Sequence, residues 1–329
     1  MAITDVIQSE RRRPALSHWL HHEVVLALIL VLSLLVLATQ TDRFLTTENL
    51  LNQGRLMAEV GLVALPMTFI IITAGIDLSV GSILGLTAII LGVSWKNLGL
   101  PLGAAIFVAM SVGTFAGFVN GWFITRVNVP PLIMTLATLA LYRGLAEGTS
   151  QARSVRGYPE WFFELGQGEI LGVPTQLWIL CLAIIVAWLL LAYTAFGRSL
   201  YAIGHNETGA RFSGIPVDRY KMIIYTASGF MASLAGCIFV SRVSTTRSDM
   251  GTGLELDVIA AVVLGGTSIF GGVGTIAGTV LGFIMIQLLK NGLSLTGVKG
   301  DATIIVIGSV LILSILLTNF IQHRRGDSE

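Results

Sequence analysis

Charged residues are scarce in this chain. Only 12% of its 329 residues are charged, whereas soluble domains have about 25%. Hydrophobic residues make up 54% of the chain, which is more apolar surface than one globular core can bury. These proportions exclude a soluble globular protein and predict a chain that lies in a lipid bilayer.

Residue patterns that support catalysis or cofactor binding are also missing. No glycine-lysine dipeptide occurs, so the phosphate-binding loop is absent and the chain does not itself hydrolyse ATP. Neither H-E-x-x-H nor G-x-S-x-G occurs. Cys181 and Cys237 lie in separate apolar stretches, where cysteine usually behaves as a small hydrophobe. We therefore expect no enzyme activity, catalytic residue, cofactor or metal, and the net charge of +1 suggests no nucleic-acid partner.

Long hydrophobic runs are abundant. Nine stretches of at least sixteen residues are free of charge: 24–41, 60–76, 78–95, 97–125, 127–142, 170–197, 222–241, 258–289 and 302–323. A bilayer core about 30 Å thick needs about 20 helical residues. The stretch 258–289 would form a helix of roughly 48 Å, and a glycine-rich break at 265–274 divides it, so we interpret it as two short spans. The sequence predicts an all-α, polytopic membrane helix bundle of about ten transmembrane helices in one domain, residues 24–321.

Arginines near both ends indicate the orientation. Arg11 to Arg13 and Arg324-Arg325 favour the cytoplasm, and ten spans place both ends on one side. We expect a cytoplasmic N-terminal segment, 1–23, a cytoplasmic tail, 322–329, and a cytoplasmic loop, 197–221. The start of the chain resembles a signal peptide, but nine more spans follow, so we interpret it as a retained anchor. The longest outer loop, 148–169, has aromatic residues expected at a membrane surface.

Glycines are frequent, with 37 in the chain, and some recur at every fourth position. Such spacing aligns glycines on one helix face and lets two helices approach closely. The predicted helix-packing glycines are Gly113, Gly117 and Gly121 in one run and Gly274, Gly278 and Gly282 in another. We expect both helices to be buried inside the bundle.

Charge at membrane depth separates two transport mechanisms. Ion-coupled secondary carriers commonly keep ionisable groups in the membrane although each is costly there. Here Asp77 stands alone between two apolar stretches. It could carry a proton or bind a cation, but Gly75 and the following residues favour a cap of a helix start at the cytoplasmic face. Ser79, Asn120 and Thr135 are further polar candidates for structural or pathway roles. The mostly uncharged interior suits a neutral, polyhydroxylated solute.

Four motifs occur in a fixed order along the chain. They are Gly75-Ile-Asp-Leu-Ser-Val-Gly-Ser82, Val129-Pro-Pro-Leu-Ile-Met-Thr-Leu-Ala-Thr138, the segment Gly197 to Pro216, and Glu255 to Gly274 followed by Asn291-Gly-Leu-Ser-Leu. Together they resemble the permease family of ribose-type ABC importers, which handle sugars such as ribose, xylose and rhamnose and the furanose-like autoinducer. The resemblance covers the chain from about residue 55 to its end.

This resemblance implies a multi-pass protein of the bacterial inner membrane, in contact with membrane lipid. The implied partners are a second permease subunit, identical or not, a cytoplasmic ATP-binding subunit and a periplasmic solute-binding protein. The implied solute is a pentose, a deoxyhexose such as rhamnose, or a furanose-like autoinducer. A self-sufficient ion-coupled carrier is the alternative; a membrane-embedded enzyme lacks the necessary nucleophile or metal set.

The loop 197–221 is the long inner connection in which a permease could receive movement from an ATPase. Asn206 can cap a short helix, Glu207 favours its first turn, Gly214 suits a left-handed stop and Pro216 prevents continuation. This predicts a helix over 207–213. From these residues alone, a solvated loop that merely fixes orientation is equally compatible. The family resemblance favours docking to the ATPase through Gly204, His205, Asn206, Glu207, Ala210, Arg211, Phe212 and Gly214.

Overall fold

The protein is described by a computed structural model. It describes residues 16–40, 43–151 and 153–297, and single residues 302, 305, 308 and 309. The helices are α2 (Leu16–Gln40), α3 (Thr47–Ile72), α4 (Val80–Lys96), α5 (Leu102–Arg126), α6 (Pro131–Ser150), α7 (Glu160–Gly166), α8 (Thr175–Tyr193), α9 (Ala195–His205), α10 (Glu207–Phe212), α11 (Val217–Val243), α12 (Leu254–Leu264) and α13 (Ile276–Leu295). Two short antiparallel strands, β1 (Glu169–Ile170) and β2 (Val173–Pro174), form a hairpin.

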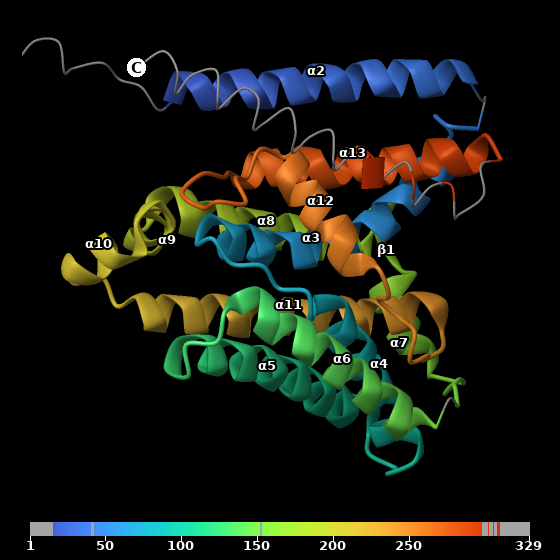
Figure 1. The fold of residues 1–329 in the computed structure, drawn as a ribbon. Helices are drawn as coiled ribbons and strands as arrows, with labels where there is room; N and C mark the ends of the chain where they lie inside the picture. Colours follow the sequence, from blue (N-terminus) through green and yellow to red (C-terminus); the bar gives the residue numbers. More distant parts are fainter. Residues whose placement is uncertain are drawn as a thin grey trace, which may run out of the picture.

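Most long helices lie side by side along one direction (Figure 1). Within the described ranges, five helices are long and apolar enough to cross a membrane, α3, α5, α8, α11 and α13. The prediction of a membrane helix bundle therefore agrees with the structure. The tenth predicted span, 302–323, and the tail, 322–329, fall largely or wholly outside the described residues, as does most of the segment 1–23.

The stretch 258–289 belongs to two helices that the glycine-rich segment separates. Its first helix, α12, has 11 residues, which is about 16 Å of helix and roughly half of a bilayer core. The glycine-rich segment after it leads into α13, which has 20 residues. The structure therefore divides the stretch at the predicted break, and the number of membrane crossings in it stays a prediction.

Glycines set the contact between α5 and α11. A Cβ at Gly117 would lie 2.3 Å from the carbonyl oxygen of Tyr225, and one at Gly113 would lie 2.5 Å from Ser233. A Cβ at Gly121 would lie 3.1 Å from the Cα of Met222, which is also in α11. The expectation that this whole helix is buried is wrong, because α5 exposes a second face that includes Phe107 and Phe115.

The second glycine run is divided between a loop and a helix. Gly278 and Gly282 of α13 face the backbone of α12, where a Cβ would lie 2.0 Å from the carbonyl oxygen of Gly265 and 1.9 Å from that of Ala261. Gly274 is not on this helix, because the N-cap is Thr275, whose hydroxyl accepts a hydrogen bond from the amide of Gly278. The prediction of a continuous helical stripe is thus wrong for Gly274.

The segment after α6 is folded rather than spread on a surface. Tyr158 and Phe162 are buried, and the ring of Tyr158 stacks on Trp95 with centroids 4.5 Å apart. Ser241 donates a hydrogen bond to the carbonyl of Phe162. Only Trp161 of these three aromatic residues is exposed, so the expectation of an aromatic surface segment holds for Trp161 and is wrong for its buried neighbours.

Candidate coupling site

Two short helices, α9 and α10, protrude at one end of the bundle (Figure 1). Asn206 ends α9, and its side-chain oxygen accepts a hydrogen bond of 2.8 Å from the amide of Gly209, which caps α10. Gly214 has a φ of +81°, the left-handed conformation that favours glycine after a helix. Pro216 then forms the N-cap of α11. These features agree with the sequence prediction, except that α10 ends at Phe212 and Ser213 is its C-cap.

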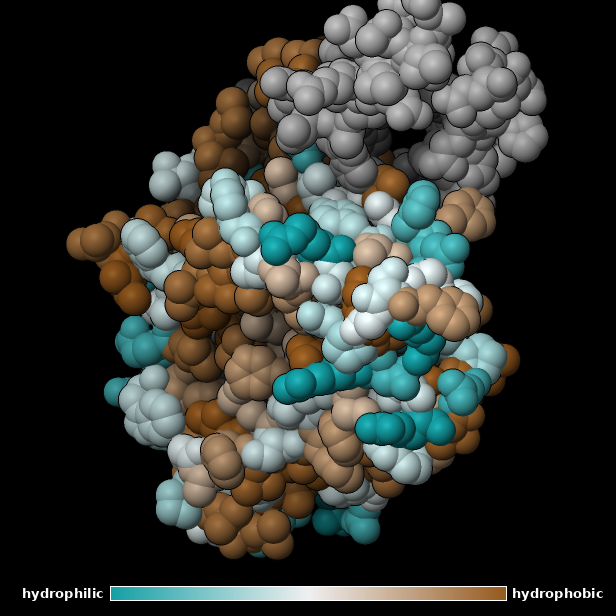
Figure 2. Space-filling view, turned by 90° about the vertical axis from the view of Figure 1, so that its left-hand side faces the viewer, coloured by the Kyte–Doolittle hydropathy of each residue, from teal (hydrophilic) through white to brown (hydrophobic). Residues whose placement is uncertain are grey.

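Phe212 lies at the end of α10 with 89% of its surface exposed. Covering this side chain with another surface would remove its apolar area from water, which is favourable. The end of the molecule that carries α9 and α10 gathers hydrophilic residues across its middle, with hydrophobic residues to the left and below in Figure 2. An apolar side chain beside a polar field is the composition of a protein interface.

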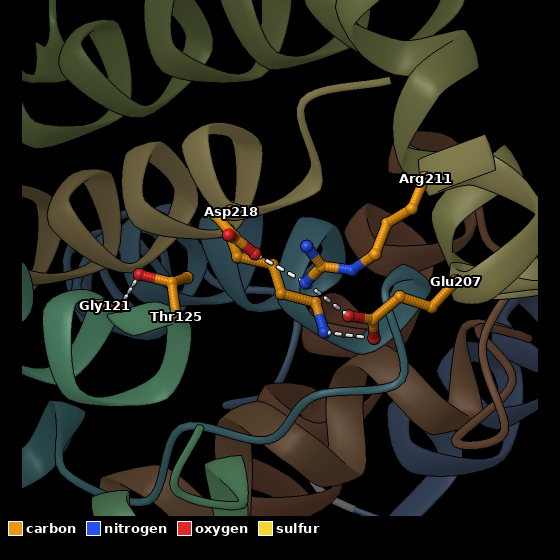
Figure 3. Close-up of polar contacts among 6 residues, drawn as sticks. Gly121, Thr125, Glu207, Arg211 and Asp218 are labelled. Carbon is orange, nitrogen blue, oxygen red and sulfur yellow. Dashed lines mark hydrogen bonds and ion pairs between the residues drawn. The ribbon is translucent and has the colours of Figure 1, made fainter. Parts of the chain in front are cut away.

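Ion pairs hold α10 against the start of α11 (Figure 3). Arg211 binds Glu207 at 3.0 Å and Asp218 at 2.5 Å, and Lys221 binds Glu207 at 2.6 Å. Burial opposes ionisation of Glu207, but the hydrogen bonds and charges of Lys221 and Arg211 outweigh it and lower the pKa of this carboxyl. The side chain of Lys221 is only 12% exposed, so the network joins an exposed helix to a buried lysine. It fixes the direction in which α10 points.

Three distant chain segments meet at Gly204, near the end of α9. A Cβ there would lie 1.8 Å from the carbonyl oxygen of Ile72 and 2.4 Å from the amide nitrogen of Gly272. These two groups hydrogen-bond each other at 2.8 Å. Only glycine fits between them, so α9 lies directly on the end of α3 and on the loop before α13.

A second bond strengthens this junction. The hydroxyl of Tyr201, one turn earlier in α9, donates a hydrogen bond of 2.6 Å to the carbonyl of Gly274. His205, beside Gly204, lies 3.4 Å from a Cβ placed at Gly272. The loop near 271–274 and the segment 197–221 are therefore parts of one structure.

The chain leaves the junction through a non-helical segment, 73–79, that runs back into the bundle to the start of α4 (Figure 1). Asp77 is fully buried there. Its carboxylate accepts hydrogen bonds from the amide of Ser79 at 3.0 Å, the hydroxyl of Ser79 at 2.6 Å and the hydroxyl of Ser228 at 3.0 Å. All three hydrogen bonds come from uncharged donors.

The position of Asp77 corrects one expectation. Ser228 is eleven residues into α11, which places it about 16 Å from the helix start. Asp77 is therefore well inside the bundle rather than at its face. It also binds the residue that precedes α4, Ser79, instead of the first turn of that helix, so it organises a turn before the helix.

The other polar candidates surround the same segment. Asn120 of α5 donates a hydrogen bond of 2.8 Å to the hydroxyl of Ser79, and Thr135 of α6 donates one of 3.1 Å to the carbonyl of Ile76. All are buried. Because these groups satisfy one another, they join α4, α5, α6 and α11 to the segment 73–79, and they do not line an open path.

The remaining predicted residues of α10 divide between a buried face and an outward face. Ala210 is buried beneath α10 against Ile203 and Val217, whereas Arg211 and Phe212 face outward. The sequence analysis missed Tyr201 of α9 and its junction with Ile72 and Gly272, because these two residues lie far from Gly204 in the chain, at positions 72 and 272. The arrangement can transmit a displacement of α10 to the end of α3 and to the loop before α13, because no flexible side chain intervenes at Gly204.

Comparisons with known proteins agree with the predicted resemblance. Residues 49–315 match the family described as "Branched-chain amino acid transport system / permease component". The chain is 39% identical over 317 residues to the ribose import permease protein RbsC of Escherichia coli K12, covering 94% of this chain and 97% of the relative.

Two further relatives give the same result. RbsC of Bacillus subtilis is 38% identical, covering 95% of this chain and 98% of its own length. The autoinducer 2 import system permease protein LsrD of Photorhabdus temperata is 35% identical over 92% of both chains. No solved structure matches the chain. On the extent of the family match and of these identities, the chain belongs to the branched-chain amino acid transport system permease family and is a multi-pass membrane protein.

Proposed function

We propose that this chain is the membrane-spanning subunit of an ATP-driven bacterial importer for a small sugar or sugar-like solute. The observation that carries the proposal is the projecting α10 with its exposed Phe212, fixed to the bundle at Gly204. The relatives named as ribose and autoinducer 2 import permeases support the solute class. The chain itself is a transport subunit, and ATP hydrolysis belongs to a separate partner.

The proposed topology has ten spans with both termini in the cytoplasm of a bacterium and the bundle in its inner membrane. The end that carries α10 then faces the cytoplasm, where an ATP-binding subunit can dock. The opposite end faces the periplasm and a solute-binding protein. The exposed apolar faces of α5, α6 and α8 contact lipid or the second permease subunit, which is identical or related.

The proposed mechanism is mechanical. An ATPase that closes around nucleotide displaces α10, and the ion pairs of Glu207 prevent α10 from swivelling independently. The displacement passes through α9 to Gly204, and from there to the end of α3 and the loop before α13. Coupling of this kind requires that the element have two discrete arrangements that the nucleotide biases.

Transport in vesicles tests the proposal against an ion-coupled carrier. Right-side-out vesicles would contain the chain with its ATPase, and the solute-binding protein would be added outside. Labelled D-ribose, D-xylose, L-rhamnose or autoinducer 2 would then be supplied as the solute. We expect uptake of one of them that needs ATP inside and the binding protein outside. Uptake should survive an uncoupler of ion gradients. Uptake driven by an ion gradient without the ATPase would overturn the proposal in favour of the carrier.

A further inference from the structure

A cavity whose lining combines amides and charged side chains with apolar ones lies between α3, α11, α12 and α13, away from the coupling site. Its volume is about 820 Å³, within the range of small-molecule binding sites. Along α3 it extends from Asn49 to Glu59, ten residues or about 15 Å. Neither contact with lipid nor docking of an ATPase requires amides and charged side chains at this depth in an apolar bundle.

Four amides form a ladder on one side of the cavity. Asn49 and Gln53 are four residues apart on α3, and Gln287 and Asn291 are four apart on α13. Asn49 and Asn291 exchange two hydrogen bonds of 3.0 Å, and Gln287 donates one of 2.8 Å to Gln53. The side-chain oxygen of Gln287 accepts no hydrogen bond from any described residue, and the hydroxyl of Thr245, also in the lining, is buried without a partner.

The charges around the cavity cancel. Three acidic residues in its lining each have a basic partner: Glu59 binds Arg242 through two bonds of 2.7 and 3.1 Å, Asp257 binds Lys290, and Asp249 binds Arg247. An ionic ligand would meet no free opposite charge there. Amides and paired carboxylates instead offer many donors and acceptors at fixed positions, which suits a ligand with several hydroxyl groups.

The cavity is closed toward the end that carries α10. Every residue of α3 from Gly61 to Ile72 is buried, so the cavity stops near Glu59. Asn52, in contrast, is exposed near the start of α3. Among the described residues, the cavity therefore opens toward the end opposite α10.

We propose that this cavity is a binding site for a neutral, polyhydroxylated solute, entered from the periplasmic side and contacted by Gln53, Gln287 and Asn291. The inference rests on the proposed function, because it assigns the opening to the periplasm. It places solute contacts within one subunit, on α3 and α13, whose other ends adjoin the junction at Gly204 and Gly272. Binding and coupling thus lie at opposite ends of the same helices.

Thiol labelling tests the position and the ligand class together. Asn52→Cys and Gln287→Cys are introduced separately with Cys181→Ser, which removes the exposed native thiol; Cys237 is buried. A membrane-impermeant methanethiosulfonate reagent is added from the periplasmic side to the assembled importer. Ser111→Cys is the control, because Ser111 lies in an apolar groove on α5 with Phe107 and Phe115.

We expect both cavity cysteines to be labelled. The rate of labelling should fall about fivefold or more when the best-transported solute of the vesicle panel is present, because bound solute blocks access of the reagent to the cavity. L-lysine should not protect, and Ser111→Cys should not be labelled. Asn52 has no structural hydrogen bond to lose, so its variant tests the cavity even if Gln287→Cys fails to fold.

A matched pair of variants tests the solute contacts. Gln287→Leu should raise the KM for uptake about fivefold through loss of hydrogen bonding, whereas Ser111→Ala should not change it. If the unmodified importer takes up solute normally but the cysteines are not protected, or the KM of Gln287→Leu is unchanged, the cavity proposal is wrong and the proposed function still stands. Absence of uptake for every solute of the panel would instead remove the proposed function.

Discussion

At the scale of single residues, Gly204 is the most constrained position of the coupling site. Its hydrogen faces the backbone of Ile72 and of Gly272, and neither backbone group can move without breaking the bond between them. Glycine is required here for space, since its φ is not in the left-handed range.

We predict that Gly204→Ala abolishes solute uptake while the protein still reaches the membrane. The added methyl group would separate α9 from the end of α3, because 1.8 Å is far below a normal carbon-oxygen contact. Uptake and membrane levels measure the effect. Gly103→Ala is the control, since a Cβ there meets nothing within 4 Å; equal uptake by the two variants would contradict the prediction.

Asp77 is a second residue whose role can be tested. We predict that Asp77→Asn retains most of the uptake, because an amide oxygen can still accept the hydrogen bonds from Ser79 and the hydroxyl of Ser228 can reorient. Asp77→Leu should reduce membrane levels, since it leaves buried donors unsatisfied at about 1 to 3 kcal/mol each. Loss of uptake by Asp77→Asn at normal membrane levels would favour a proton-carrying role.

Some of these residues could be predicted from the sequence and others could not. The caps at Asn206 and Gly214 follow from four or five neighbouring residues, so local rules were sufficient. The space at Gly204 depends on Ile72 and Gly272, and no local rule connects these three positions. The four-residue spacing of the amides on α3 and α13 is visible in the sequence, but their pairing requires knowing that the two helices are neighbours.

At the scale of elements, α10 is held by charges, so its orientation should depend on pH. The pKa of Glu207 is lowered in the folded protein, so the carboxylate stabilises the fold above its ordinary pKa and this contribution is lost as pH falls through the folded value. We predict that α10 loosens in acid below the ordinary glutamate value of 4.5.

A spin label at Phe212→Cys, with Cys181→Ser, measures this loosening. Its mobility should be low at neutral pH and rise in acid, and Glu207→Gln should give the mobile spectrum already at neutral pH. An acid-independent spectrum that Glu207→Gln also leaves unchanged would show that the ion pairs do not orient α10.

The helices α4 and α12 illustrate the limit of span counting. Helix α4 is about as long as the stretch 78–95 that predicted it, whereas α12 is far shorter than the stretch 258–289, because the non-helical segment 265–275 divides that stretch. Hydrophobicity reports burial in protein and burial in lipid alike, so a charge-free stretch does not by itself reveal where a helix starts.

At the scale of the whole molecule, the orientation in the membrane joins the two proposed sites. We predict that a C-terminal reporter active only in the periplasm stays silent, since the arginines near both ends favour the cytoplasm. A strong periplasmic signal would contradict the ten-span topology. A cytoplasmic reporter at the same position is the matched control.

The central claim is that movement of an ATPase reaches this chain through Phe212 of α10. Removal of a buried aromatic anchor costs an interface about 2 kcal/mol or more. Phe107→Ala, on the exposed face of α5, is a control that removes the same side chain elsewhere. Co-purification with the ATPase and solute uptake are measured for both variants at equal membrane levels. The account predicts that Phe212→Ala weakens co-purification and abolishes uptake while Phe107→Ala changes neither; wild-type assembly and uptake in Phe212→Ala would contradict it.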